Sequence, residues 1–281
     1  MVSGAARVAG VMGWPISHSL SPRLHGFWLE HYGVDGAYVP LAVPPESIAE
    51  AIRALPKLGF RGANVTVPHK QAAFDAMDMA SDTAQRLEAV NTITVQEDGS
   101  LFGDNTDGFG FIENLNALAG DRAVKNQSIV VLGAGGAARG VVGALVDGGA
   151  ATVRVVNRTE SKAQALAGDL DGEITAHGWN DMDAVLADST LLVNTTSLGM
   201  AGQPPLEIDL SPLSSHAVVT DIVYNPLQTP LLKRAEDHGF KTVDGLGMLL
   251  HQARPGFAAW FGREPEVTPA LRAHVLAGLS S

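Results

Sequence analysis

The feature that most restricts the fold is a nearly continuous apolar segment that runs directly into a glycine-rich turn. The segment is Ser128–Leu132, and the turn is Gly133-Ala134-Gly135-Gly136-Ala137-Ala138. Apolar residues at successive positions indicate a strand buried on both faces, which is typical of parallel sheets covered by helices. A helical pattern continues from the turn to about Asp147. Together these features predict a strand–turn–helix unit inside a parallel sheet.

The same alternation of strand and helix extends over most of the 281 residues. The expected strands are Arg7–Met12, Ala37–Val43, Ala63–Val67, Ala151–Val156, Thr190–Asn194, Val218–Val223 and Lys241–Val243. One expected helix begins after an N-cap at Ser21. The other expected helices cover Ser47–Leu58, Lys70–Met77, Asp107–Leu118, Glu160–Ala167, Pro230–His238 and a tail from Leu246. Asn91–Val95 and Ser100–Gly103 flank Glu97-Asp98-Gly99, which predicts a hairpin. The fold class is therefore α/β, and the length favours about two domains.

The glycine turn matches the pattern G-x-G-x-x-G/A in the context that gives this pattern meaning, between a buried strand and a helix. Gly133 permits the tight turn, Gly135 lets the backbone approach a pyrophosphate, and Ala138 keeps helix and strand close. The helix N-terminus then presents free N–H groups to the phosphates. We predict a dinucleotide site, and the alternative is a glycine turn that holds no ligand.

The next strand ends at Val156-Asn157-Arg158-Thr159, where an NAD site commonly has an acidic residue for the ribose 2′-hydroxyl. No acid stands there. Arg158 can instead bind a 2′-phosphate through charge-assisted hydrogen bonds, with Thr159 and Lys162 nearby. The sequence thus favours NADP over NAD, and the alternative for Arg158 is a solvated surface residue.

Composition excludes several other classes of protein. There is no cysteine, which excludes a disulfide scaffold, thiolate metal sites and a cysteine nucleophile. A net charge of −11 lacks the basic surface expected of a nucleic-acid binder, and no apolar run reaches the ~20 residues of a membrane helix. The histidines show no metal-ligand spacing, so no metal is expected. We expect a cytoplasmic protein.

Small polar residues gather where strands of the first half end. They occupy Ser17–Pro22, Asn64–Lys70, Val90–Thr92 and Gly103–Gly108. Ligands of doubly wound sheets bind beyond the carboxyl ends of the strands. Hydroxyls, amides, a lysine and a carboxylate at that edge suit a polyhydroxylated, neutral or anionic small molecule. Taken singly, Ser21 and Asp107 could be no more than helix caps, and Asn64 could simply close a turn.

These motifs, in this order, resemble those of the shikimate dehydrogenase family across nearly the whole chain. The segments that carry the resemblance are Gly13–Ile16, His18–Pro22, Asn64–Lys70, Ala89–Thr92, Gly103–Gly108, Gly133–Gly140, Asn157–Thr159, Asp221–Pro226 and Asp244–Leu249. The resemblance implies reversible NADPH-dependent reduction of 3-dehydroshikimate to shikimate, in aromatic amino-acid biosynthesis. It also implies a substrate domain of residues 1–108 and 245–281, onto which C-terminal helices return, and a Rossmann-type NADP domain of residues 109–244.

The resemblance further implies a role for individual residues. The catalytic pair would be Lys70 and Asp107. Substrate would be bound by Ser19, Ser21, Asn64, Thr66, Asn91, Tyr224 and Gln252. Cofactor would be bound by Gly133, Ala134, Gly135, Gly136, Ala137, Asn157, Arg158, Thr159, Lys162, Ile222 and Gly245. One departure is Glu88, where the family commonly has glycine, and it leaves the backbone near Asn91 less certain.

Lys70 as an ammonium can donate a proton to the alkoxide that forms when a ketone accepts hydride. A neighbouring Asp107 would favour the charged form of the lysine, and the sequence does not say which of the two transfers the proton. Two alternatives stay open. One is a quinate/shikimate dehydrogenase of the same superfamily that uses NAD. The other is a catalytically silent protein that binds NADP or a metabolite. A monomer and a homodimer both fit the sequence.

Overall fold

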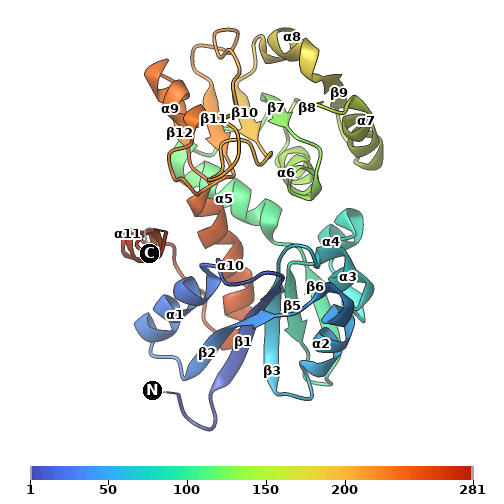
Figure 1. Ribbon diagram of the computed structural model, residues 1–281, viewed down its shortest axis with the longest axis vertical. Helices are drawn as coiled ribbons and strands as arrows, with labels where there is room; N and C mark the ends of the chain where they lie inside the picture. The colour runs from blue at the N-terminus through green and yellow to red at the C-terminus, as the bar shows by residue number, and fades with distance from the viewer. Residues whose placement is uncertain (1, 280–281) are drawn as a thin grey trace. The chain divides into compact units, whose positions relative to one another are not determined.

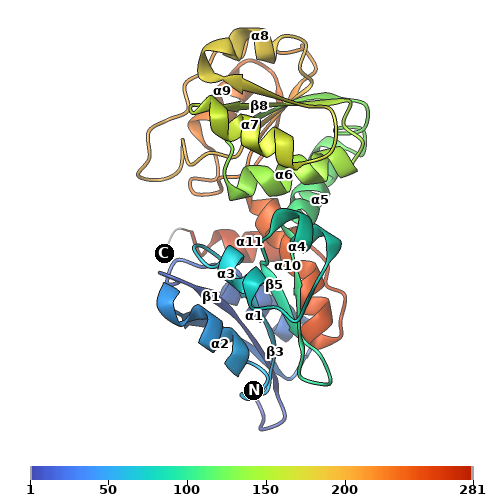
Figure 2. The same cartoon turned by 90° about the vertical axis from the view of Figure 1, so that its right-hand side faces the viewer.

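The computed structural model describes residues 2–279, which divide into two compact units. The first unit contains residues up to Thr106 together with Gln252 onward, and the second contains Asp107–His251. The second unit is thus a continuous stretch of chain inserted into the first. The sequence expectation places the two divisions after residues 108 and 244, whereas these units divide after residues 106 and 251. Each unit is built on its own sheet (Figures 1 and 2).

The sheet of the first unit has the strand order β2-β1-β3-β5-β6-β4. Its strands are β1 (Arg7–Gly13), β2 (Gly36–Ala42), β3 (Phe60–Val65), β4 (Met79–Ala80), β5 (Thr92–Val95) and β6 (Leu101–Asp104). β1 pairs in parallel with β2 and β3, whereas β5 runs antiparallel to both β3 and β6. The antiparallel pair β5–β6 confirms the expected hairpin. Because β3 ends where β5 begins, Asn64 and Thr92 are paired across the two strands.

Helices cover both faces of this sheet. The helices of the first unit are α1 (Ser21–His31), α2 (Ile48–Ala54), α3 (Lys70–Asp75), α4 (Asp82–Leu87), the end of α10 (Leu246–Phe261) and α11 (Pro269–Leu276). One core joins α2, α3 and α4 to Met12, Ala63 and Val65 of the strands. On α1 and α10, the side chains of Trp28, Phe257 and Trp260 form a second, aromatic core.

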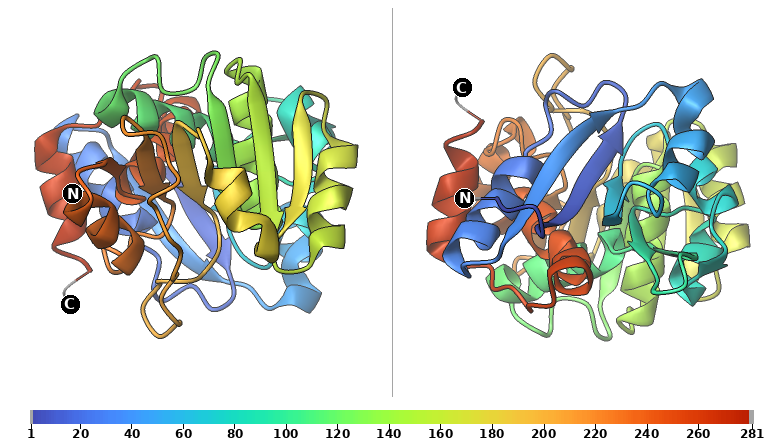
Figure 3. Two further views of the ribbon diagram at one scale, coloured as in Figure 1. Left: turned by 90° about the horizontal axis from the view of Figure 1, so that it is seen from above. Right: turned by 90° about the horizontal axis from the view of Figure 1, so that it is seen from below.

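The sheet of the second unit is entirely parallel, with the order β12-β11-β10-β7-β8-β9. Its strands are β7 (Ser128–Leu132), β8 (Thr152–Asn157), β9 (Ile174–Gly178), β10 (Leu191–Asn194), β11 (Val218–Asp221) and β12 (Lys241–Val243). This is the doubly wound Rossmann order, in which the order of successive strands reverses between β7 and β10. The left view of Figure 3 shows these strands side by side.

Alternate residues of β7 face opposite cores. Ile129 and Val131 pack against α5 (Asp107–Ala119), α6 (Gly136–Asp147) and α7 (Glu160–Asp169). Val130 and Leu132 pack against α8 (Met182–Leu186) and α9 (Pro230–Asp237). All four β7 side chains are fully buried, which confirms the expectation from their unbroken apolar run.

Helix ends differ in places from the sequence expectation. Leu20, not Ser21, is the N-cap of α1, and Ser21 is the first helical residue. The expected helix Ser47–Leu58 is a short 3-10 turn, Pro45–Ser47, followed by α2, which ends at Ala54. Pro56 lies just beyond that end, and because a proline has no backbone N–H it cannot continue the hydrogen bonds of the helix.

Two short strands, β4 and β9, and two short α-helices, α4 and α8, have no counterpart in the expected series. β9 has no buried residue and lies at the edge of its sheet, so its sequence lacks the apolar pattern of a central strand. The helices α4 and α8 have six and five residues, too few to show a helical period. None of the described helices is both long and apolar enough to cross a membrane.

Candidate functional site

In the first unit, the amide of Asn64 lies at the centre of a buried hydrogen-bonded network. Its Oδ1 accepts a hydrogen bond from the hydroxyl of Tyr38 (2.6 Å). Its Nδ2 donates to the carbonyl of Asn91 (3.1 Å) and to Oγ1 of Thr92 (3.1 Å). Asn64 is 6% exposed, so much of its hydrogen-bonding capacity serves the protein itself. Its predicted contact with substrate stays a prediction.

Asn91 extends the network toward the C-terminal segment. Its Oδ1 accepts hydrogen bonds from the backbone N–H of Thr106 (2.9 Å) and from Oγ1 of Thr92 (2.9 Å). Its Nδ2 donates to Oε1 of Gln252 (3.4 Å), and Oγ1 of Thr106 donates to the carbonyl of Gln252 (2.9 Å). Three residues predicted to bind substrate, Asn64, Asn91 and Gln252, are therefore joined although they lie far apart in the sequence.

The two predicted serines approach the same network from the start of α1. Ser21 is buried, and it partly opposes the rise in the pKa of the Tyr38 hydroxyl that burial causes. Ser19 is half-buried in the preceding loop, where its Oγ accepts a hydrogen bond from the N–H of Ser21 (3.3 Å). Thr66, just after β3, is half-buried, and a Cβ on Gly13 would lie 2.6 Å from its methyl group. The polar cluster, defined here as Ser19, Ser21, Asn64, Asn91 and Gln252, thus lies near the carboxyl ends of β1 and β3.

Lys70 is the first residue of α3, and its side chain is half-buried. Its backbone carbonyl accepts a hydrogen bond from the N–H of Val90 (2.9 Å), which places Lys70 beside the segment that carries Asn91. His69, which precedes it, is buried, and its Nε2 is 2.8 Å from the carbonyl oxygen of Val43. His69 thus fixes the start of α3, and with it the backbone of Lys70.

The turn after β7 in the second unit has the geometry that its glycines predicted. Gly133 has φ +109°, and a Cβ there would lie 2.7 Å from Oγ1 of Thr195. Gly135 and Gly136 are exposed, and an added Cβ on either would meet no atom within 4 Å. Ala138 is fully buried against the sheet. The N-terminus of α6 therefore has open space in front of its unpaired N–H groups, which fits a pyrophosphate.

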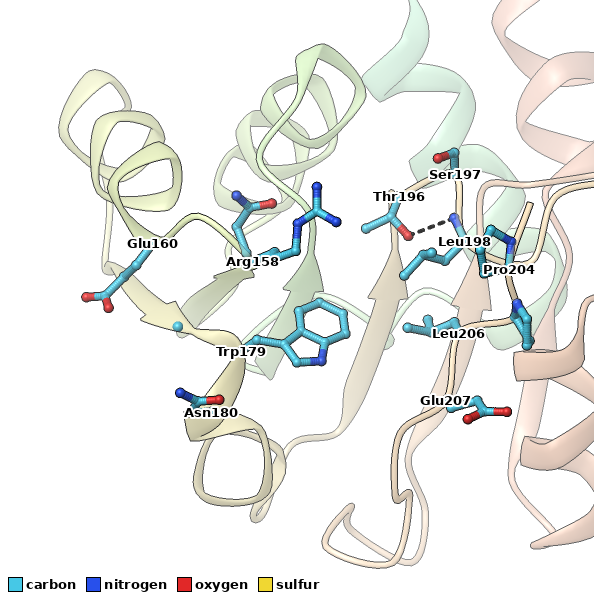
Figure 4. Close-up of a pocket in the computed structure, with 13 residues that line it drawn as sticks. Arg158, Glu160, Trp179, Asn180, Thr196, Ser197, Leu198, Pro204, Leu206 and Glu207 are labelled. Carbon is cyan, nitrogen blue, oxygen red and sulfur yellow. Dashed lines mark hydrogen bonds between the residues drawn. The ribbon is translucent and has the colours of Figure 1, made fainter.

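A pocket of about 980 Å³ lies at the carboxyl ends of β8, β9 and β10 (Figure 4). On one side are Asn157 and Arg158 at the end of β8, and on the other are Thr196 and Leu198 in the turn after β10. The indole of Trp179 lies between them, below the guanidinium of Arg158 in the view shown. No acid occupies the end of β8, and Arg158 lines the pocket, as a 2′-phosphate site requires.

Not every predicted cofactor residue lines this pocket. Thr159 and Lys162 are exposed at the start of α7 and are not among the residues that line it. The carbonyl of Thr159 accepts hydrogen bonds from Nδ2 of Asn157 (2.8 Å) and from the N–H of Lys162 (3.0 Å). Thr159 thus shapes the turn that carries Arg158, and direct contact of Thr159 or Lys162 with cofactor stays a prediction.

The structure brings Ile222 and Gly245 together. A Cβ on Gly245 would collide with the carbonyl of Ile222, so only glycine allows the two backbones to approach so closely. Tyr224, two residues after Ile222, is half-buried, and desolvation raises the pKa of its hydroxyl.

Asp107 is half-buried at the start of α5. Asp107 belongs to the second unit and Lys70 to the first.

Several pocket residues were missed by sequence reasoning: Trp179, Asn180, Thr196, Ser197, Leu198, Pro204 and Leu206. Thr196 and Ser197 carried a usable signal, because they follow an apolar strand just as Gly133 does. Trp179 carried none, since β9 itself was not predicted.

Across the residues that the structure describes, no group of three or more His, Asp or Glu side chains is placed to hold a metal ion.

Comparison with protein-family models finds two matches. Residues 11–93 match the shikimate dehydrogenase substrate binding domain, and residues 117–201 match shikimate / quinate 5-dehydrogenase. Among curated proteins, the shikimate dehydrogenase (NADP(+)) of Rhodospirillum rubrum is 58% identical over 98% of this chain and 99% of its own length.

Two solved structures are similar over nearly the whole chain. The shikimate 5-dehydrogenase of Thermus thermophilus, in complex with NADP(H) and shikimate, is 36% identical with a TM-score of 0.85, covering 97% of this chain and 99% of that one. The quinate dehydrogenase of Corynebacterium glutamicum, in complex with NAD, is 32% identical with a TM-score of 0.89, covering 97% and 99%.

Proposed function

Because this chain belongs to the shikimate dehydrogenase family, we propose that it catalyses the reversible NADPH-dependent reduction of 3-dehydroshikimate to shikimate, in aromatic amino-acid biosynthesis. The observation that carries the proposal is the joining of Asn64, Asn91 and Gln252 in one buried network beside Lys70. Amide and hydroxyl groups held in fixed positions suit the hydroxyls of a polyhydroxylated ring.

The two units divide the work in this proposal. The first unit, which carries the polar cluster, Thr66 and Lys70, binds the substrate, with Ser19 and Ser21 at its carboxylate. The second unit binds the cofactor along Gly133–Ala137, Asn157–Lys162, Ile222 and Gly245, and Tyr224 serves the substrate. The open space at Gly135 and Gly136 and the Arg158-lined pocket both support the second assignment.

A dinucleotide held by these residues would supply the hydride chemistry, donating hydride to the carbonyl carbon or accepting it in the reverse direction. The protein manages the charge that develops on the carbonyl oxygen. The ammonium of Lys70 donates the proton that converts the alkoxide to a hydroxyl, and neutral Lys70 accepts that proton when shikimate is oxidised. Asp107 is the second member of the proposed pair, and its role would be to favour the charged form of the lysine.

Arg158 supports NADP as the proposed cofactor. Its guanidinium faces the pocket at the end of β8, the position where NAD-binding sheets commonly place an acid. A guanidinium pairs well with a phosphate dianion and gains much less from a neutral ribose hydroxyl.

The experiment that tests this function measures initial rates with shikimate and with quinate, each against NADP⁺ and NAD⁺. We expect turnover to be fastest with shikimate and NADP⁺. Turnover with no pair would instead favour a protein that only binds a dinucleotide or metabolite. Faster oxidation of quinate with NAD⁺ would favour the second candidate, a quinate dehydrogenase, to which the similarity with the Corynebacterium glutamicum enzyme points.

A biosynthetic role also supports a cytoplasmic location, which cell fractionation tests. The chain itself supports a monomer or a homodimer equally, and gel filtration with light scattering distinguishes them.

A further inference from the structure

A buried carboxylate that the proposed chemistry does not use lies at the end of β11. Asp221 is fully buried, and its Oδ1 accepts hydrogen bonds from Nδ2 of Asn194 (3.0 Å) and from the N–H of Val223 (3.0 Å). Its Oδ2 accepts one from Oγ1 of Thr229 (2.8 Å). Burial raises the pKa of Asp221, and these three donors oppose that rise. Burying a carboxylate costs free energy unless hydrogen bonds satisfy its oxygens.

The contact with Asn194 leads directly to the cofactor pocket. Asn194 ends β10, is fully buried, and is paired with Asp221 across the two strands. Its Oδ1 accepts hydrogen bonds from both the N–H (3.0 Å) and Oγ1 (2.7 Å) of Thr196. Its Nδ2 also donates to the carbonyl of Leu198 (3.2 Å). One side-chain amide therefore holds most of the turn after β10.

The orientation of that amide depends on Asp221. A carboxylate can only accept hydrogen bonds, so it requires the NH₂ group of Asn194 to face it. The oxygen of Asn194 must then face Thr196, where two donors need an acceptor. Thr196 in turn accepts a hydrogen bond at Oγ1 from the N–H of Leu198 (3.1 Å), drawn as the dashed line in Figure 4.

The turn held in this way forms one wall of the pocket. Thr196 and Leu198 line it opposite Arg158 and Trp179 (Figure 4). At the other end of the turn, Thr195 lies against Gly133, and its Oγ1 donates to the carbonyl of Leu132 (2.7 Å). This is the point where the strand order reverses, at which doubly wound sheets bind their ligands.

We propose that Asp221 is a positioning residue for cofactor binding: through Asn194 it holds the Thr196–Leu198 turn in the shape that forms the pocket wall. Asp221 touches neither the pocket nor the reacting atoms in this scheme. The inference rests on the proposed function only in that the pocket binds a dinucleotide. Because Asp221 also holds Val223, one carboxylate organises both the pocket wall and the segment that carries Ile222 and Tyr224.

The test compares the dissociation constant for NADP⁺, by isothermal titration calorimetry, in Asp221→Leu, Asn194→Ala and Asp221→Asn. The first two remove the acceptor or the amide, so we expect the dissociation constant to rise about 10-fold or more. Asp221→Asn keeps an acceptor for Asn194 and places its NH₂ toward Thr229, so its dissociation constant should stay close to wild type. In steady state, Asn194→Ala, which leaves the contact between Asp221 and Val223 in place, should raise the KM for NADP⁺ while the KM for shikimate changes little.

Two control variants separate positioning from loss of stability. Thr229→Val removes the donor at the other oxygen of Asp221 and the N-cap of α9, and Thr220→Val removes a buried hydroxyl that donates to the carbonyl of Val243. Both should lower the melting temperature without changing the dissociation constant. If Asp221→Leu does not fold, Asn194→Ala decides the question.

An unchanged dissociation constant in a folded Asn194→Ala protein would overturn the proposal. So would an equal loss of affinity in the two threonine controls, because that would mean general destabilisation. Amide hydrogen exchange gives an independent readout: Thr196 and Leu198 should lose protection in Asn194→Ala and keep it in Asp221→Asn. If the wild-type chain binds no NADP⁺, the proposed function fails together with this inference, whereas binding by all variants alike rejects the inference alone.

Discussion

Lys70 shows how a single residue combines an unfavourable position with a proposed role. It begins α3, where the positive end of the helix dipole disfavours a cation, and it is half-buried beside the segment that carries Asn91. A lysine with no function would be more stable near the C-terminus of the helix. The position therefore agrees with a functional role for the ammonium group of Lys70.

Replacing Lys70 by alanine should lower kcat by ~10²–10⁴-fold, because the proton donor to the developing alkoxide is lost. The KM for shikimate should change much less. Steady-state kinetics at saturating cofactor measure both constants. Lys57→Ala, at an exposed lysine of the same unit, is the matched control. A Lys70→Ala enzyme with nearly wild-type kcat would remove Lys70 from the mechanism.

Arg158 should decide between the two dinucleotides. Arg158→Ala removes a charge-assisted bond to a 2′-phosphate, so the KM for NADPH should rise ~10–100-fold while that for NADH changes little. Lys233→Ala, at an exposed cation on α9, controls for the lost charge. Equal changes in the two KM values would show that Arg158 does not read the phosphate.

His25 is a buried histidine with an unusual environment. It is fully buried, and its ring stacks on that of Tyr38 with the ring centroids 3.8 Å apart. Among the residues that the structure describes, neither ring nitrogen has a hydrogen-bond partner. Desolvation lowers the pKa of His25 from 6.5 to about 3, and the nearby Asn64 amide opposes this only in part. The native state therefore holds His25 neutral where the unfolded chain would protonate it.

This difference makes stability depend on pH. His25 costs nothing above pH 6.5, and between pH 6.5 and 3 it should lower the free energy of unfolding by ~1.4 kcal/mol per pH unit as the pH falls. His25→Phe should remove that contribution, so the wild-type and variant curves should differ in slope. Urea unfolding at pH 7 and pH 5 measures the slope, with exposed His216→Phe as control. Parallel curves for wild type and His25→Phe would contradict the lowered pKa.

Among the helices, α4 explains the one departure from the family pattern. Glu88 is its C-cap and has φ +48°, in the left-handed region that glycine adopts without strain. A glycine at this position would therefore suit the left-handed end of the helix. The neighbouring backbone is held independently: the N–H of Asn91 donates to Asp104 (3.0 Å), and its carbonyl accepts from Val65 (2.8 Å).

Glu88→Gly should therefore stabilise the protein, by about 1 kcal/mol, because glycine relieves the left-handed strain. Glu88→Ala should give no such gain, since alanine carries the same Cβ. Chemical unfolding of the two variants measures the difference, and kcat should be unchanged in both. Equal stability of the glycine and alanine variants would mean that the backbone at this cap is not strained.

The two units differ in whether they are formed by one continuous stretch of the chain. The second unit is one continuous stretch, but the first needs residues from both ends of the chain. Trp260 is 1% exposed, and its Nε1 donates to the carbonyl of Ile93 (2.9 Å). Trp28 donates in the same way to the carbonyl of Glu266 (2.9 Å). The C-terminal segment is part of the core of the first unit.

Ending the chain after His251 should therefore unfold the first unit and leave the second folded. Removal of Phe257 and Trp260 takes away two large buried side chains, each worth about 3–5 kcal/mol. Hydrogen exchange followed by mass spectrometry should show protection lost in β1–β3 and kept in β7–β11. Protection retained in β1–β3 would show that the first unit folds without its C-terminal segment.

Sequence reasoning succeeded where a pattern is local. The run Ser128–Leu132, the turn at Gly133 and the hairpin around Asp98-Gly99 each carry their own signal within a few residues, and the structure has all three. It failed at the edge strand β9, whose residues are half-exposed, and at the N-cap of α1, where a serine and a proline suggested a start one residue too late.

The amino-acid sequence alone was enough for the parallel cofactor sheet, the open glycine turn and the family motifs, because periodicity and turn chemistry depend on neighbouring residues. Only the tertiary structure could join Asn64 to Asn91 and Gln252, place Trp179 across from Leu198, or put Asp221 behind Asn194. Each of these depends on which strands lie side by side. A buried polar group hydrogen-bonds to whichever group the fold brings within about 3 Å. Such partners are distant in the sequence, so no local sequence pattern predicts them.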